Sequence, residues 1–417
     1  MKTYIMMFGI ANIVAGGPIY DANKIEYLEQ SGWNVIVFPI NDGDIYIEPL
    51  KKYSGQSYEF IQEPISMFTK KEIKKKISLL ASRVEPTSDE IIIETGTDYT
   101  ALWGELLARD LNAKHFIMFL DEKNPNVNND TYAFYKFKYD RNELASISLD
   151  SLDYIFGKYF ELHNKEEHVL KACCTNSVKN IECKWLDSIP NADYSIGSIG
   201  RLEKAFVPII VDGICEFSRK VPEKKIAVVF FGDADACNVE PITIIKEKLE
   251  KCNNIQMLIT GYMWPIPEDA IKKMDVFVSG AGSARVSANC GIPTIKMDVI
   301  TNAPIGYVKD AKNCINLPLC KNNATLCDYL CETLLNGKNP EIYNKISVNE
   351  HMMWVKECFD QHMKFIRKSK CEKKYYPVEK IYNSSNKCMK FYIKKTMIHI
   401  FGYDLYIKIK NKIYQFV

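Results

Sequence analysis

Several signatures of common protein classes are missing from this chain of 417 residues. No apolar run approaches the ~20 residues that a membrane-spanning helix requires. A phosphate-binding GxxxxGK(S/T) loop is missing, and no full GxGxxG follows the first apolar run, so ATP and NAD are disfavoured as ligands. Acidic and basic residues nearly cancel to a net charge of +2, which argues against a dedicated nucleic-acid binder.

Cysteine and histidine occur without the spacing of a metal site. The fourteen cysteines include no CxxC motif, and the spacing of Cys320, Cys327 and Cys331 fits helix faces better than metal ligands. None of the six histidines stands in a metal-binding pattern. We therefore expect no metal and no bound cofactor. Cysteines without pattern are typical of a reducing compartment, which favours the cytoplasm.

Length and composition predict a folded protein of two domains. A hydrophobic content of 47% and a charged content of 25% are ordinary for globular chains. At this length a chain usually divides into domains of roughly 150 to 200 residues. We expect an N-terminal domain over residues 1–190 and a C-terminal domain over 191–340. Helices over 341–372 and a basic, aromatic tail over 373–417 are expected to follow.

The first half alternates buried strands with helices, a pattern typical of a parallel sheet covered on both faces. Lys2 before an apolar run also matches a signal peptide, but the chain continues directly into a helix and a second strand, which favours a buried first strand. We expect strands at 3–8, 34–40, 89–95 and 115–122, helices at 21–31, 69–83 and 100–112, and a strand-like unit at 148–157.

The alternation restarts after about residue 190. Residues 193–204 lead into a helix, and strands are expected within 224–234, 254–261 and 274–284. Two such halves predict an α/β fold of two Rossmann-like parallel-sheet domains that face each other across a cleft, with a basic C-terminal extension.

Four turns follow the predicted strands: residues 15–18, 94–100, 231–234 and 279–285. Ligands of open parallel sheets bind beyond the carboxyl ends of the strands, where helix N-termini offer free amides to anions. Glycine allows the backbone to approach phosphate oxygens closely. The predicted phosphate-binding positions are Gly16, Gly17, Gly232, Gly280, Gly282 and Ser283.

Several of these stretches resemble the GT-B glycosyltransferases, particularly the family 4 group of bacterial surface polysaccharide biosynthesis. CGIPTI at 290–295 resembles the element that closes the donor site, and SIGRLEKAF at 198–206 resembles the GRL motif that opens the C-terminal domain. FFGDA at 230–234 resembles the G-D-G turn, and AGGPIY at 15–20 with its helix and strand looks like the first βαβ unit. The resemblance spans about residues 3–335.

The resemblance implies a nucleotide diphosphate sugar bound mainly by the C-terminal domain, as a co-substrate, with the acceptor approached from the N-terminal domain. Arg201, at the GRL arginine, would stabilise the departing diphosphate. Phe206 occupies the position of the family's lysine, so Lys204 is the expected substitute, and Arg285 adjoins the same turn. Val286 replaces an acidic residue of the family, which leaves retaining chemistry open.

Carboxylates at the ends of two strands are the candidate bases. An inverting transferase needs a base for the acceptor hydroxyl, whereas a retaining one can rely on stabilising the leaving phosphate. Asp121 or its neighbour Glu122 is expected to supply it. Glu94, Thr95 and Asp98 are the predicted acceptor-side residues.

The tail concentrates positive charge. From Lys364 to the end, fourteen basic residues stand against three acidic ones, interleaved with Phe, Tyr and Ile. This combination suits an anionic membrane surface on the cytoplasmic side, but a small added subdomain or a solvated run of charge accounts for it equally well.

Taken together, these features predict a sugar transferase that moves a sugar from a nucleotide-sugar donor to a glycan or a lipid-linked acceptor in cell-surface polysaccharide assembly. A polyol-phosphate transferase of the same architecture is one alternative. A non-catalytic two-domain protein that binds a glycan or a nucleotide is the other, because Val286 replaces the acidic residue.

Overall fold

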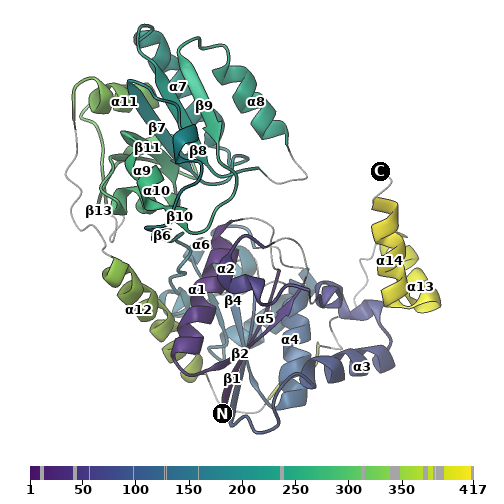
Figure 1. Ribbon diagram of the computed structural model, residues 1–417. Helices are drawn as coiled ribbons and strands as arrows, with labels where there is room; N and C mark the ends of the chain where they lie inside the picture. The colour runs from purple at the N-terminus through teal and green to yellow at the C-terminus, as the bar shows by residue number, and fades with distance from the viewer. Residues whose placement is uncertain are drawn as a thin grey trace.

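The computed structural model shows two α/β units, one above the other in Figure 1. Strand β1 lies in the lower unit, strand β7 in the upper unit, and the C-terminal helices return to the lower one. The structure describes residues 1–9, 14–40, 45–55, 57–96, 98–125, 127, 129–157, 159–234, 239–310, 315–338, 348–369, 374–378, 381 and 389–414.

The lower, N-terminal unit is built on a parallel five-stranded sheet in the order β2-β1-β3-β4-β5. The chain starts in the middle of this sheet, and β1 pairs with β2 on one side and with β3 on the other. Ile, Val, Met and Phe fill these strands, as buried parallel strands require. The bounds are β1 (Lys2–Phe8), β2 (Asn34–Pro39), β3 (Glu90–Thr95), β4 (Lys114–Phe119) and β5 (Leu144–Ser146).

Helices cover both faces of this sheet. Alternate residues of β1 point to opposite faces, so Tyr4 and Met6 join the core beneath α1 and α12, whereas Ile5 and Met7 join the core beneath α3 to α6. The helices of this unit are α1 (Gly16–Gln30), α2 (Glu48–Lys51), α3 (Lys70–Ala81), α4 (Asp98–Leu111), α5 (Tyr132–Tyr139) and α6 (Leu149–Phe156).

The prediction of a strand-like unit at 148–157 is wrong, because these residues form α6. The side chain of Ser148 caps the helix by accepting from the Ser151 amide. Leu152, Ile155 and Phe156 recur at helical spacing and are fully buried. The strands predicted in the rest of this unit are confirmed, and α1 begins five residues before the predicted 21–31 helix.

The upper, C-terminal unit has a seven-stranded sheet in the order β14-β13-β12-β11-β7-β8-β9. Its five strands from β12 to β9 are parallel, whereas β13 and β14 add an antiparallel edge. Renumbered along the chain, the parallel strands follow the order 5-4-1-2-3, which is the Rossmann order read in reverse. The bounds are β7 (Tyr194–Ile199), β8 (Ile226–Phe231), β9 (Ile255–Ile259), β11 (Val276–Gly280), β12 (Thr294–Met297), β13 (Pro304–Asp310) and β14 (Ile315–Leu317).

Helices cover this second sheet as well. Helices α7, α8 and α11 share one hydrophobic core with it, and α9 and α10 share another. A two-stranded ribbon of β6 (Val178–Lys179) and β10 (Ile266–Pro267) lies outside the main sheet. The helices are α7 (Val207–Lys220), α8 (Glu240–Leu249), α9 (Glu268–Lys272), α10 (Ser283–Asn289) and α11 (Leu326–Leu334).

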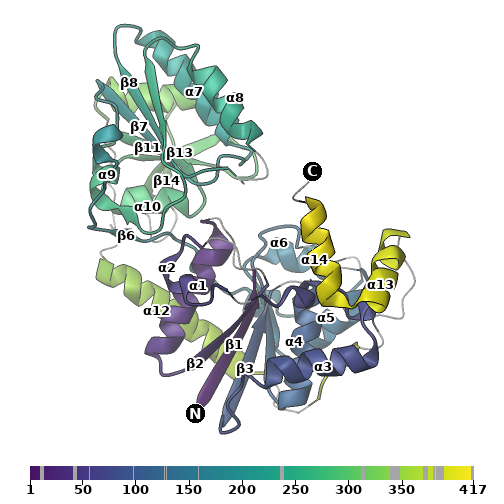
Figure 2. The ribbon, with the colours of Figure 1, turned by 45° about the vertical axis from the view of Figure 1, so that its right-hand side comes forward.

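After the second unit, the chain crosses back to the first. Helix α12 (Val348–Arg367) runs beside α1, as both ribbon views show (Figures 1 and 2). Phe359 of α12 is fully buried against Tyr20 of α1. Two last helices, α13 (Met389–Phe401) and α14 (Tyr403–Tyr414), stand at the outer side of the N-terminal unit near α3. None of the described helices is both long and apolar enough to cross a membrane.

Candidate active site

The main cavity lies between the two units and has a volume of about 470 Å³. In the C-terminal unit it lies beyond β7 and β11, the point at which the strand order reverses and where open α/β sheets bind ligands. Two larger hollows of about 790 and 660 Å³ lie beside α7 and α11, away from the predicted residues. Nine predicted residues line the main cavity: Gly16, Gly17, Asp121, Glu122, Arg201, Lys204, Gly232, Gly282 and Ser283.

Close backbone contact shapes the C-terminal wall of this cavity. A Cβ atom on Gly232 would lie 2.0 Å from the carbonyl oxygen of Gly200. Gly200 itself has φ of +135°, a conformation that other residues rarely adopt. The turns after β7 and β8 can therefore touch only because both positions are glycine.

The N-terminal end of α1 forms the opposite wall. No side chain caps this 15-residue helix at Ala15, so its first amides face the cavity at Gly16 and Gly17 without a side-chain acceptor. Beyond Gly17 there is open space, because a Cβ there would meet nothing within 4 Å. Helix α7 also begins at this cavity without a side-chain cap. Uncapped helix N-termini carry partial positive charge and favour an anion.

Two basic side chains follow β7 at the same cavity. Arg201 is 38% exposed and forms an ion pair of 3.0 Å with Glu203, so its guanidinium remains accessible from the cavity. The pKa of Lys204 is lowered, mainly by burial of its ammonium group and also by the positive charge of the nearby Arg201. A bound anion would reverse both effects because it stabilises the ammonium form. These two cations make the C-terminal wall suitable for a diphosphate.

The carboxylates predicted at the end of β4 lie on the N-terminal side of the same cavity. Asp121 and Glu122 are both exposed and line it. Loss of hydration raises the pKa of Asp121, which moves this carboxylate toward the range of a general base. Asp121 also lines a second, smaller cavity, so it lies where the two cavities meet.

Two asparagines of the main cavity were not predicted. The side-chain oxygens of Asn176 and Asn302 are buried and have no hydrogen-bond partner among the described residues. Buried acceptors without partners are costly, and hydroxyl groups of a ligand would satisfy them. Asn176 is held from its other end, because its amide donates to the carbonyl of Met263 at 3.2 Å.

The second cavity has a volume of about 220 Å³ and belongs to the N-terminal unit. It lies beyond β1 and β3, where the order of this sheet reverses. The predicted residues Glu94 and Thr95 line it, although the hydroxyl of Thr95 lies 2.9 Å from the ring of His115. Asp21 of α1 lines it too and was missed. Asp21 is 7% exposed. Its pKa is raised well above the usual value, mainly because it is buried and also because the negative charge of Glu94 is near.

A buried polar network supports this second cavity from behind. Lys24 is fully buried, pairs with Glu94, and donates to the Tyr20 hydroxyl at 2.9 Å. Tyr20 donates to the other oxygen of Glu94 at 2.7 Å, and Tyr4 donates to the same oxygen as Lys24. His362 of α12 approaches Lys24 and Tyr20 at 3.4 Å. Glu94 is therefore held in place, whereas the described residues offer Asp21 no hydrogen bond.

Two predicted residues lie elsewhere, and the side chain of a third is not described. Gly280 is buried at the end of β11, where a Cβ would lie 2.7 Å from the ring of Phe206, so this glycine serves packing and does not line the cavity. Arg285 turns toward α12, with its guanidinium 5.9 Å from the ring of Trp354. Asp98 begins α4, but its side chain lies outside the described residues.

The two departures from the resembled motifs have structural explanations. Val286 is 2% exposed in the hydrophobic core beneath α10, so its position faces the core. Phe206 is also buried, and Lys204 lies at the cavity instead. Among the described residues, no three His, Cys, Asp or Glu side chains come together in a way that could hold a metal ion.

Several solved structures resemble this one at low sequence identity. A glycosyltransferase from Rickettsia africae has 13% identity and a TM-score of 0.52, covering 92% of this chain and 98% of its own. HepE from Anabaena, solved with UDP, has 12% identity and a TM-score of 0.50, covering 88% and 98%. A UDP-GlcNAc 2-epimerase from Neisseria meningitidis, solved with UDP-GlcNAc, has 12% identity and a TM-score of 0.47, covering 86% and 100%.

No protein-family model and no curated relative matches the sequence. The structural likeness therefore rests on shape at low identity, and it shows the fold alone. The predicted α/β class with two Rossmann-like parallel-sheet domains of the GT-B kind is confirmed.

Proposed function

We propose that this protein is a glycosyltransferase that takes a sugar from a nucleotide diphosphate sugar. The observation that carries the proposal is the position of Arg201 and Lys204, at the strand-order reversal of the C-terminal sheet and opposite the uncapped end of α1. Cations and free amides there face one cavity, as a diphosphate requires. The UDP-bound structure of the HepE protein supports the same reading, since it shares the fold.

The acceptor enters from the second cavity. Asp121 borders both cavities, so a hydroxyl held beside it would face the donor sugar. The carboxyl group of Asp21, which lines this cavity without a hydrogen bond from the described residues, suits a hydroxyl group of a neutral glycan, and Glu94 lines the same cavity. A glycan or the sugar end of a lipid-linked precursor is therefore the proposed acceptor, in cell-surface polysaccharide assembly on the cytoplasmic side.

Transfer breaks the bond between the anomeric carbon and the diphosphate oxygen and forms a bond to the acceptor oxygen. Arg201 and Lys204 stabilise the negative charge that develops on the leaving diphosphate. Asp121 or Asp21 accepts the proton of the acceptor hydroxyl. No metal is required in this scheme, because two cations and helix N-termini already face the leaving group.

Two alternatives give different products. A polyol-phosphate transferase would take a cytidine diphosphate polyol and release CMP, because the bond between its two phosphates breaks. A non-catalytic protein would bind a nucleotide without turnover, an alternative kept open by Val286.

The test is release of nucleotide from a panel of nucleotide sugars and CDP-polyols, in the presence of glycan and lipid-linked acceptors. The proposal expects a nucleoside diphosphate and a glycosylated acceptor from one donor. Release of CMP would establish the first alternative. Binding of a nucleotide without any product across the panel would establish the second.

A further inference from the structure

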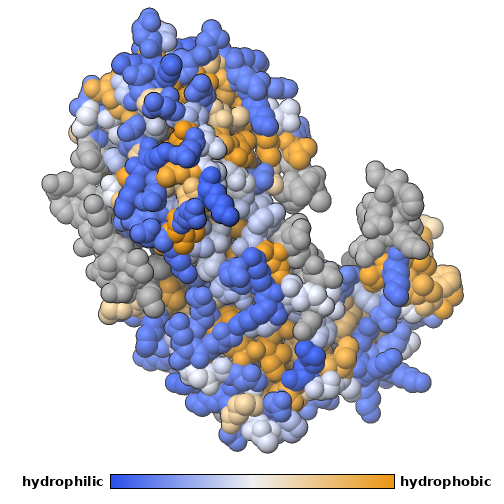
Figure 3. Space-filling view, viewed as in Figure 1, coloured by the Kyte–Doolittle hydropathy of each residue, from blue (hydrophilic) through white to orange (hydrophobic). Residues whose placement is uncertain are grey.

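The C-terminal helices present a row of apolar side chains to solvent. Along α13, exposed residues recur at positions 389, 392, 393 and 400, which is the spacing of one helix face. Met389 is 78% exposed and Ile400 is 67% exposed. Figure 3 shows hydrophobic residues gathered at this outer end of the molecule. We call this set the apolar ridge; its members are Met389, Tyr392, Ile393, Ile400, Phe401 and Leu405.

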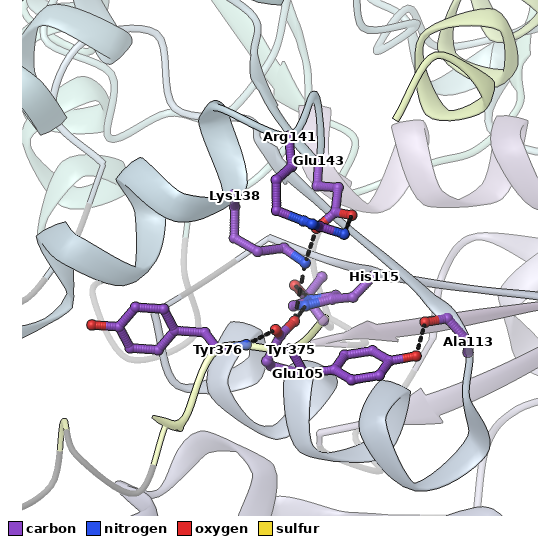
Figure 4. Close-up of polar contacts among 9 residues, drawn as sticks. Glu105, Ala113, His115, Lys138, Arg141, Glu143, Tyr375 and Tyr376 are labelled. Atoms are coloured by element: carbon purple, nitrogen blue, oxygen red, sulfur yellow. Dashed lines mark hydrogen bonds and ion pairs between the residues drawn. The ribbon is translucent and has the colours of Figure 1, made fainter. Parts of the chain in front are cut away.

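The segment that leads to the ridge is fixed to the N-terminal unit. The backbone amide of Tyr376 donates to the carboxylate of Glu105 at 2.7 Å, and the Tyr375 hydroxyl donates to the carbonyl of Ala113 at 3.0 Å (Figure 4). Glu105 also binds Lys138 at 3.0 Å and His115 at 2.8 Å. A buried network therefore holds the chain just before the helices.

Helices α13 and α14 themselves pack on the N-terminal unit beside α3. The ammonium of Lys76 lies 4.7 Å from the ring of Tyr403 of α14 and 4.8 Å from the ring of Phe68. Lys394 of α13 pairs with Glu63 at 2.5 Å. Ile398 is fully buried in the core of the N-terminal unit. The inner side of the two helices is therefore used for packing, and the apolar ridge is left on the outside.

The helices at and beside the ridge are rich in lysine. The sequence of α3 contains five lysines and one glutamate, and that of α13 and α14 contains six lysines and one aspartate. Four lysines of α3, at positions 70, 71, 74 and 75, are exposed. Both ribbon views show α3 beside α13 and α14 (Figures 1 and 2).

We propose that the apolar ridge and the exposed lysines of α3 together dock the protein on a membrane surface that carries anionic lipid. Apolar side chains enter the headgroup region while lysines contact the charged headgroups. A second copy of this chain is a poor occupant, because two such faces would bring their lysines together. Docking through the N-terminal unit would bring the proposed acceptor side to lipid-linked glycans, but it does not depend on sugar transfer.

Flotation of the full-length protein with vesicles tests the proposal without any sugar. Vesicles of phosphatidylcholine with phosphatidylglycerol should carry the protein at low salt, and binding should weaken as salt is raised. Vesicles of phosphatidylcholine alone should bind it at least tenfold more weakly. Equal binding to both kinds of vesicle, or no binding to either, would overturn the proposal.

Two variants separate the contributions of charge and apolar surface. Changing Lys70, Lys71, Lys74 and Lys75 to Gln should weaken binding about fivefold per lysine at low salt. Changing Ile393 and Ile400 to Ser should weaken it at least tenfold without loss of folding, because both are exposed. The matched control changes Lys246, Lys248 and Lys251 of the C-terminal unit to Gln and should bind normally. Unchanged binding by both test variants would contradict the assignment of this face.

Discussion

Gly232 and Gly200 meet so closely that a single methyl group between them would lie 2.0 Å from a carbonyl oxygen. Neither turn could move away without shifting β7 or β8, the strands that carry the C-terminal wall of the main cavity. Because Arg201 directly follows Gly200, the close backbone contact between the two glycines also determines where Arg201 lies.

Gly232→Ala should displace the turn after β7 and weaken nucleotide binding about tenfold or more, because the contacted atom is backbone and cannot rotate away. The control is Gly213→Ala in α7, where a Cβ would meet the side chain of Leu326 at 2.8 Å, away from the main cavity, so nucleotide affinity should stay normal. Melting temperatures of both variants give the check on folding. A stable Gly232→Ala protein with normal affinity would contradict the role of this contact.

Arg201→Ala should lower turnover at least about tenfold, the effect of losing ~1.4 kcal/mol of transition-state stabilisation. Its melting temperature should be unchanged, because the side chain is 38% exposed and its ion pair is with Glu203, two residues along the chain. Arg219→Ala, an exposed arginine at the end of α7, is the matched control. Steady-state rates with the active donor provide the measurement, and an unchanged kcat would remove Arg201 from the site.

Nucleotide affinity should fall as pH rises from neutral to alkaline. Burial and Arg201 lower the pKa of Lys204 in the free protein, and a bound diphosphate raises it. Nucleotide affinity is therefore highest below the pKa of free Lys204, where the ammonium is already charged, and it declines as the pH rises above that pKa. Lys204→Arg keeps its charge and should abolish this decline when calorimetric titrations are compared across pH. A wild-type affinity that stays constant over that range would contradict contact between Lys204 and the diphosphate.

Asp21→Asn and Asp121→Asn should identify the base. Whichever residue accepts the proton should lose turnover about a hundredfold on substitution, since general bases contribute 10²–10⁴-fold, roughly, to such reactions. The raised pKa of either carboxylate also predicts that turnover rises with pH as the carboxylate loses its proton. Asp150→Asn, at an exposed position of α6, is the control. Normal turnover in both test variants would exclude a base at either position.

The fold was largely predictable because buried strands and amphipathic helices have different periods. The prediction of a strand-like unit at 148–157 failed because the segment is short. Its apolar residues Leu149, Leu152 and Ile155 are spaced as in a helix, but eight residues rich in apolar side chains also fit a buried strand. Helix α6 was recognisable from Ser148, a favoured N-cap residue, but not from hydrophobicity alone.

The sequence predicts which residues reach the cavity more readily where a single turn carries them than where distant segments of the chain combine. Arg201, Lys204 and the glycines follow strands, so the rule about carboxyl ends of parallel strands located them. Asp21 and Asn176 lie in a helix and in a connecting segment, and they reach their cavities only through tertiary packing. Gly280 follows a strand too, but its neighbour Phe206 occupies the space beside it.

The most direct test of a nucleotide site at the main cavity is the melting temperature of the full-length protein with UDP, GDP, CDP and ADP. A ligand that binds only the folded state raises the melting temperature, by an amount that grows with concentration above Kd. We predict a clear rise with one nucleotide, and a much smaller rise when Arg201 and Lys204 are both changed to Ala. If none of the four nucleotides raised the melting temperature, or if the double variant showed the same rise as the wild-type protein, the proposed nucleotide site at the main cavity would be contradicted.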